Sequence, residues 1–180
     1  MTITSAQLDA HWMPFTGNRQ FKKDPRIMVA AEGRYYIDSN GRKIFDGLSG
    51  LWTCGLGHKV TRINEAIKEQ LDTLDFSPSF QFGHSKSFKL AELITSFTPK
   101  GLNRVFFTAS GSDAVETALK IARAYWAHKG LPSKSKFIGR TKGYHGVNFG
   151  GLSVGGIEAN RKIFGDLLPA NHLKETITSE

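Results

Sequence analysis

Hydrophobic and polar positions follow two different periods along this chain. Between Ile27 and Asp46, three short apolar runs are separated by Glu32-Gly33 and by Ser39-Asn40-Gly41. Runs of this length are typical of β-strands, and Asn-Gly is a strong signal for a tight turn between antiparallel strands. The stretch therefore predicts a three-stranded antiparallel meander beside the main fold, preceded by an N-terminal arm of little pattern. Within that arm His11–Phe15 is an apolar knot that we expect to pack on another surface.

Beyond residue 59 helical spacing takes over. Apolar residues recur on one helix face in three segments, 60–74, 88–97 and 115–125. Short strand candidates lie at 105–108 and 136–140, and their alternation with helices predicts an α/β sheet. Two strands alone leave bare edges, so the pattern also predicts that this sheet domain is incomplete.

The last part of the chain gives a weaker pattern. The glycine-rich residues 147–156 predict a short helix or a turn. From Asn171 onward the tail shows no helix stop and no partner for a strand. We therefore expect that the tail ends without closing a domain.

The stretch from Arg104 to Tyr125 joins a strand candidate to a helix through Ser110-Gly111-Ser112. The free N–H groups and the dipole of a helix N-terminus favour an anion, and serine hydroxyls can add donors. Ser110-x-x-Asp113 has the form of a capping box with Asp in the place of Glu. The residues predict a phosphate site, but an ordinary capped helix without a ligand explains them equally well.

Three other places carry candidate pocket residues. Trp52 lies in a glycine-rich loop, and such a permissive loop around one large aromatic suits a pocket wall, although Trp52 could equally fill a core. A second aromatic loop holds Phe80 and Phe82. Tyr144-His145 follows the strand candidate at 136–140, where α/β sheets place ligand contacts. For these two residues, plain packing and a satisfied structural histidine remain equal alternatives.

Composition narrows the function classes. The net charge is +8, but the basic residues are scattered and no nucleic-acid motif is present, so we expect no nucleic-acid partner. The single cysteine, Cys54, excludes an internal disulfide and a multi-cysteine metal site. The sequence shows neither a membrane-spanning run nor a signal peptide, and we expect a cytoplasmic protein.

Three segments together carry a resemblance to a known family: Phe107–Lys120, which begins Phe-Thr-Ala-Ser-Gly-Ser-Asp, Gly139–Gly146 and Leu48–Trp52. They are similar to the corresponding segments of the class III pyridoxal-phosphate-dependent aminotransferases. Ser77–His84 and Arg123–Trp126 resemble the omega-amino acid–pyruvate (β-alanine–pyruvate) transaminases within it. The resemblance runs from about His11 to Leu173. It implies a truncated α/β fold of fold type I, with residues 1–58 in the small-domain part and 59–180 in an incomplete large cofactor-binding domain.

The resemblance also implies residue roles. Ser110, Gly111 and Ser112 would form the phosphate cup for pyridoxal 5'-phosphate, Tyr144 would stack on the pyridine ring, and His145 would lie beside it. Trp52, Phe80 and Phe82 would shape the substrate pocket. Such an enzyme moves an amino group from an amine donor to a keto acid such as pyruvate, works as a homodimer, and needs no metal.

The chain departs from this family in length, because members are more than twice as long. Their Schiff-base lysine is expected beyond Glu180, so we assign no catalytic residue here and expect the isolated chain to be inactive. Two alternatives remain open. One is a non-catalytic remnant that binds phosphate or pairs with intact subunits. The other is a class III aminomutase or decarboxylase.

Overall fold

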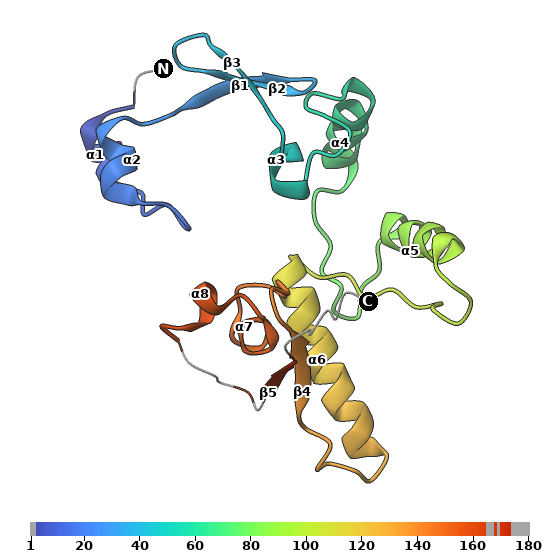
Figure 1. Cartoon of the computed structure of the whole chain (residues 1–180). Helices are drawn as coiled ribbons and strands as arrows, with labels where there is room; N and C mark the ends of the chain where they lie inside the picture. Colours follow the sequence, from blue (N-terminus) through green and yellow to red (C-terminus); the bar gives the residue numbers. More distant parts are fainter. Residues whose placement is uncertain (1–2, 165–167, 169, 174–180) are drawn as a thin grey trace, which may run out of the picture. The chain divides into compact units, whose positions relative to one another are not determined.

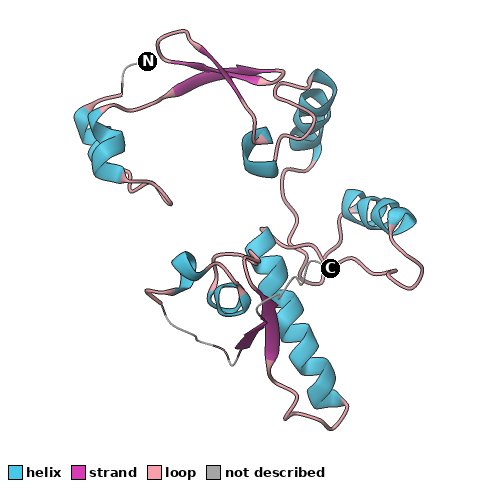
Figure 2. Ribbon diagram, in the orientation of Figure 1, coloured by secondary structure: helices cyan, strands magenta, loops and turns pink. Residues whose placement is uncertain are grey.

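The computed structural model describes residues 3–164, 168 and 170–173. It divides into two compact units, an N-terminal unit that ends at His84 and a C-terminal unit that begins at Ser85. Figure 1 gives the element labels used below, and Figure 2 marks helices and strands. The domain assignment made from the sequence, with its boundary after residue 58, stays a prediction.

The N-terminal unit contains the predicted meander. Strands β1 (Met28–Glu32), β2 (Tyr35–Asp38) and β3 (Lys43–Phe45) pair in the order β1-β2-β3, and both pairs are antiparallel (Figure 2). The turn between β2 and β3 runs through Gly41, whose φ of 78° is a conformation that glycine adopts without steric cost. Its N–H donates to the carbonyl of Asp38 over 3.0 Å. The predicted meander and its Asn-Gly turn are confirmed.

Asp38 holds this turn together. Only 2% of its surface is exposed. Its Oδ1 accepts the N–H groups of Asn40 (3.0 Å) and Arg42 (2.8 Å), and its Oδ2 accepts Nε of Arg42 (2.7 Å). Burial alone would raise the pKa of Asp38, but the bonds from Arg42 and Asn40 outweigh burial and lower that pKa below its ordinary value.

Four helices complete the N-terminal unit: α1 (Ser5–Ala10), α2 (Asn18–Lys23), α3 (Ser49–Trp52) and α4 (Thr61–Thr73). Helix α4 confirms the helix predicted over 60–74. The two helices of the arm were not predicted, because each has six residues and shows no apolar period. Of the apolar knot, Trp12 and Phe15 are almost fully exposed, so neither packs on a core of the described chain.

The C-terminal unit begins with α5 (Ser85–Phe97) and α6 (Gly111–His128), which confirm the other two predicted helices. Strand β4 (Phe137–Arg140) confirms the second strand candidate. Of the two possibilities predicted for residues 147–156, the structure has the short helix, α7 (Phe149–Val154). Helix α8 (Glu158–Arg161) follows. Figure 1 shows α7 beside α6 and β4, in agreement with their contacts.

Two predictions about strands were wrong. Residues 105–108 form no strand in the structure, and Phe106 and Phe107 are exposed instead of buried, because no described strand offers them a ladder partner. The tail does supply a strand: β5 (Ala170–Leu173) pairs in parallel with β4, from Phe137 opposite Ala170 to Arg140 opposite Leu173. Parallel pairing joins segments far apart in the sequence, so no local pattern announces it.

The apolar core of the described residues is small. Leu152 and Val154 of α7 are its only buried large hydrophobic residues, at 8% and 7% exposure. Helix α7 packs against α6, β4 and β5, and this contact buries both side chains. Most other large apolar residues, among them Ile121 and Tyr125 on α6, face outward. Such large exposed apolar surfaces are typical of regions that contact another protein surface.

We expect the charge of Asp38 to stabilise the N-terminal unit in a pH-dependent way. Because its pKa is lower in the folded state, the stabilisation is present above the unfolded-state pKa of about 3.9 and is lost as the pH falls through the folded value. Asp38→Asn should therefore lower the free energy of unfolding at about pH 6, with the difference from wild type fading toward about pH 2. Urea unfolding followed by circular dichroism measures both. A difference that stays constant across this range would contradict the prediction.

Candidate functional site

The first turn of α6 carries the predicted anion site. Ser110 is the N-cap, with an extended backbone, and its Oγ accepts the N–H of Asp113 over 3.1 Å. The Ser110 hydroxyl in turn donates to Oδ2 of Asp113 over 2.8 Å. The capping box is thus only half formed, since the Asp113 carboxylate binds the hydroxyl of the cap residue and not its backbone N–H. In this structure the Ser110 hydroxyl points its proton at Asp113.

Two backbone donors at this helix end stay open. Among the described residues, the N–H groups of Gly111 and Ser112 make no hydrogen bond. Gly111 is exposed, and a Cβ built on it would meet nothing within 4 Å. Adjacent N–H groups at the positive end of an 18-residue helix, with open space in front, form an arrangement that binds a phosphate. The residues present therefore fit the phosphate group of a cofactor.

Side chains of α6 fasten the segment that follows Tyr144-His145. Ser112 Oγ accepts the N–H of Val147 over 3.1 Å. The same pattern continues along the helix: Asn148 Nδ2 donates to Oδ1 of Asp113 (3.1 Å), and the N–H of Gly151 donates to Oε1 of Glu116 (2.8 Å). Each bond spans 35 residues of sequence. Together they bring the Tyr144-His145 loop to the N-terminal end of α6.

Gly146 lets the two segments approach each other closely. Its φ is 110°, and a Cβ at this position would lie 2.9 Å from Cα of Ser112. Two residues earlier, the Tyr144 ring is 49% exposed, while His145 is half-buried. The structure thus gathers the five residues predicted for the cofactor in one unit, on α6 and on the adjoining loop. The role of each toward a cofactor stays a prediction.

The residues predicted for the substrate pocket belong to the N-terminal unit. Trp52 ends α3 and is 77% exposed, so it does not fill a core of the described chain. Phe80 and Phe82 lie in the loop after α4 and are also strongly exposed. Three large aromatic side chains that face outward, one from a short helix and two from a loop, are available to shape a pocket.

Sequence reasoning missed a buried acid–imidazole pair in this unit. His58 Nε2 lies 2.8 Å from Oδ2 of Asp46, and the two side chains are only 11% and 7% exposed. Burial would raise the pKa of Asp46, but the bonds from His58 and from the N–H groups of Gly50 and Leu48 hold that pKa below its ordinary value. The spacing of residues 46 and 58 in the sequence does not predict that their side chains are in contact. Glu116 and Asn148 were likewise not assigned to a site, and Asp113 was assigned only to the capping box, because the bonds of these residues across 35 positions join partners that are remote in sequence.

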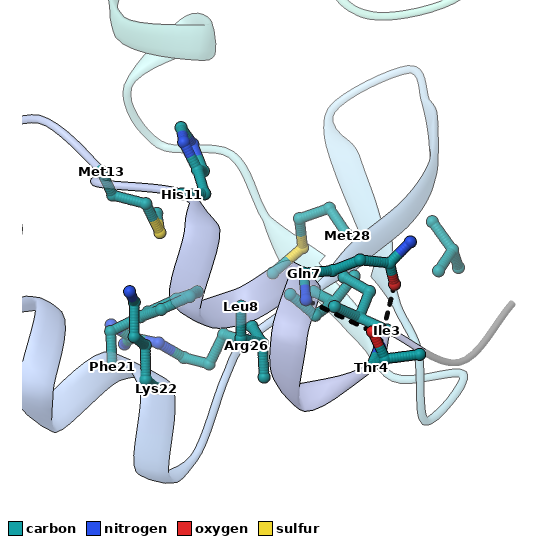
Figure 3. A pocket seen from close by; sticks show the side chains of 12 residues that line it. Ile3, Thr4, Gln7, Leu8, His11, Met13, Phe21, Lys22, Arg26 and Met28 are labelled. Carbon is teal, nitrogen blue, oxygen red and sulfur yellow. Dashed lines mark hydrogen bonds between the residues drawn. The ribbon is translucent and has the colours of Figure 1, made fainter.

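The N-terminal unit also contains a groove of about 960 Å³. Figure 3 shows that its lining comes from the N-terminal arm and β1, and it includes the apolar Leu8, Phe21 and Met28 and the basic Lys22 and Arg26. The Thr4–Gln7 capping box of α1 forms one part of the lining. None of the predicted site residues lines this groove.

No helix of the described residues is both long and apolar enough to cross a membrane.

Comparison with known proteins identifies the family. Residues 16–176 match the model of the class III aminotransferases, "Aminotransferase class-III". This match spans most of the chain, and the chain therefore belongs to the class III aminotransferases. Its members are enzymes, and the family depends on pyridoxal phosphate.

Curated relatives include two with closely related names. The chain is 59% identical over 170 residues to the β-alanine–pyruvate aminotransferase of Pseudomonas aeruginosa and 57% identical over 172 residues to the omega-amino acid–pyruvate aminotransferase of Pseudomonas putida. These matches cover 94% and 95% of this chain but 38% of each relative. The chain thus spans less than half the length of the curated relatives it matches.

Solved structures agree on the fold. The omega transaminase of Pseudomonas jessenii in complex with PMP superposes with a TM-score of 0.92 at 30% identity, over 100% of this chain and 42% of that one. An amine transaminase from an uncultivated Pseudomonas species in a PLP-bound form gives 0.85 at 37% identity, over 92% of this chain and 38% of that one. The chain has the fold of the N-terminal part of a fold-type-I transaminase, as predicted.

We expect Gly146→Ala to destabilise the C-terminal unit by about 1–3 kcal/mol, because the new methyl group meets α6 at a backbone angle that disfavours it. Gly130→Ala is the matched control. That glycine also has positive φ, 74°, but an added Cβ meets nothing within 4 Å. Urea unfolding of the two variants isolates the cost of the contact. Equal destabilisation would contradict the prediction, because the contact between the new methyl group and Ser112 would then add nothing to the loss in free energy of unfolding.

Proposed function

We propose that this chain is the N-terminal portion of a pyridoxal-phosphate-dependent transaminase that moves an amino group from an omega-amino acid or amine to pyruvate. The observation that carries the proposal is the pair of open N–H donors on Gly111 and Ser112. They stand at the end of α6 to which the Tyr144-His145 loop is fastened. Support for the substrates comes from the two Pseudomonas relatives, whose names give β-alanine or an omega-amino acid as donor and pyruvate as acceptor.

In this proposal the chain supplies the binding groups of the cofactor. The N–H groups of Gly111 and Ser112 hold the phosphate, and the Ser112 hydroxyl can donate to it, because its oxygen already accepts from Val147. The half-exposed ring of Tyr144 stacks on the pyridine ring, with His145 beside it. When bound, pyridoxal phosphate supplies the electron sink that amino-group transfer needs.

The remaining parts of the proposal concern groups outside the described cofactor residues. Trp52, Phe80 and Phe82 line the pocket for the amine donor. The lysine that carries the cofactor lies beyond Glu180, and the complete enzyme is a cytoplasmic homodimer. The named relatives are all aminotransferases, which favours a transaminase over an aminomutase or a decarboxylase.

A second candidate function is that of a non-catalytic remnant that binds phosphate or pairs with intact subunits. The large outward apolar surface of the described residues favours this candidate, because it would suit contact with a partner subunit. The two candidates differ in whether these residues can serve a complete active site.

A hybrid enzyme separates the two candidates. In it, the matched residues of this chain replace their counterparts in the Pseudomonas aeruginosa β-alanine–pyruvate aminotransferase, and the rest of that relative completes the fold. We expect the hybrid to bind pyridoxal phosphate and to form alanine from β-alanine and pyruvate. A folded hybrid without this activity would contradict the proposed function.

Within the hybrid, Gly111→Asp should weaken cofactor binding about tenfold or more, because it places a carboxylate where the phosphate needs N–H donors. Gly130→Asp is the control, since it adds the same charge at the exposed opposite end of α6. Visible absorption of the bound cofactor, titrated with pyridoxal phosphate, gives both affinities. Equal cofactor affinities in the two variants would contradict the proposal that Gly111 binds the phosphate.

A further inference from the structure

The segment that carries Trp52 has an unusual backbone. Ser49, Gly50, Leu51 and Trp52 have φ of 51°, 60°, 57° and 73°. Consecutive residues in this region form one turn of left-handed helix, which costs a non-glycine residue roughly 1–2 kcal/mol. Three of the four residues carry side chains, so the surrounding structure has to hold the turn in place.

The carboxylate of Asp46 binds the backbone at the start of this turn. Oδ1 accepts the N–H of Leu48 over 3.2 Å, and Oδ2 accepts the N–H of Gly50 over 2.7 Å. Backbone bonds close the rest of the turn: Trp52 N–H donates to the Leu48 carbonyl (3.0 Å), and Cys54 N–H donates to the Ser49 carbonyl (2.7 Å). Asp46 is the only side chain of the described residues that accepts from the N–H groups of the turn.

His58 fixes the orientation of Asp46. Because the pKa of Asp46 is lowered, its carboxylate is ionised at neutral pH and only accepts, so Nε2 of His58 is the donor in their 2.8 Å contact. His58 itself is bound to the meander at its backbone, where it exchanges two hydrogen bonds with Gly33 (2.7 and 3.1 Å). Its ring packs on Tyr36 of β2, with centroids 4.5 Å apart.

These contacts form one continuous connection from the meander to the tryptophan. We propose that the Asp46–His58 pair is a positioning device that holds the left-handed turn of Ser49–Trp52 and thereby fixes the direction of the Cα–Cβ bond from which the Trp52 side chain projects. Where Trp52 lines the pocket for the amine donor, the pair determines which donors fit. That last step rests on the proposed function, whereas the positioning of Trp52 does not.

The positioning is tested in the full chain with Trp52 as its only tryptophan, after Trp12→Phe and Trp126→Phe. Asp46→Asn leaves one acceptor oxygen for three donors, and His58→Ala removes the group that orients the acid. Both should make the backbone that carries Trp52 mobile, which lowers the fluorescence anisotropy of Trp52 toward its value in denaturant. His58→Gln keeps a side-chain N–H near the position of Nε2 and should retain the signal.

Asp38→Asn is the matched control. Asp38 is also a buried carboxylate that accepts backbone N–H groups in the same unit, but it binds Asn40 and Arg42 and not the turn. It should leave the anisotropy of Trp52 unchanged. The proposal is overturned if Asp46→Asn leaves that anisotropy unchanged, or if Asp38→Asn lowers it equally, because the effect would then report the stability of the whole unit.

Selectivity is tested in the hybrid enzyme. Asp46→Asn should reduce the preference between β-alanine and a bulky aromatic amine, measured as the ratio of their kcat/KM values, by about tenfold. The content of bound pyridoxal phosphate should not change, since its proposed ligands lie at the N-terminal end of α6 and on the loop of Tyr144 and His145. An unchanged ratio of kcat/KM values would contradict a role of the Asp46–His58 pair in the choice of amine donor. An inactive parent hybrid would contradict the proposed function, and the anisotropy of Trp52 would still decide the positioning.

Discussion

The candidate cofactor site depends on three hydrogen bonds between the first two turns of α6 and residues 147–151. They act together with backbone bonds at the other side of the loop, where the N–H of Lys142 donates to the Gly156 carbonyl (3.1 Å) and the N–H of Gly156 donates to the Gly143 carbonyl (2.8 Å). Two of the three acceptors are carboxylates. A carboxylate that accepts an N–H forms a bond about twice as strong as a neutral one, which suits a loop that offers little apolar contact.

The N-terminal unit uses the same interaction for different purposes. Asp38 accepts two backbone N–H groups and closes a hairpin, whereas Asp46 accepts two and holds a left-handed turn. Both acids are buried and both have a cationic or imidazole partner, Arg42 or His58. Each is thereby kept ionised despite its burial, and an ionised carboxylate can accept several N–H groups at once. These polar contacts order a hairpin and a turn in a unit that has no fully buried large apolar residue among those described.

The difference between local and remote interactions explains what could be predicted from the sequence. The meander, α4, α5 and α6 follow from apolar periods within about a dozen residues, and all were predicted. The strand expected at 105–108 failed because a strand requires a neighbour, and none of the described strands lies beside it. Strand β5, the bonds from Ser112 to Val147 and from Glu116 to Gly151, and the Asp46–His58 pair depend on partners that no local pattern identifies. The family resemblance located the candidate residues, and the contacts that position them required the structure.

The N-terminal end of α6 poses an electrostatic problem, because Asp113 puts a negative charge where a phosphate is proposed to bind. The structure shows how both can be accommodated. Each oxygen of Asp113 accepts a side-chain donor, Oδ2 from the Ser110 hydroxyl and Oδ1 from Asn148. Both carboxylate oxygens are thus bound by the cap residue and by the loop, while the N–H groups of Gly111 and Ser112 remain free to bind a phosphate. If Asp113 instead occupied those two donors, the helix end would be satisfied internally and would have no capacity left for an anion.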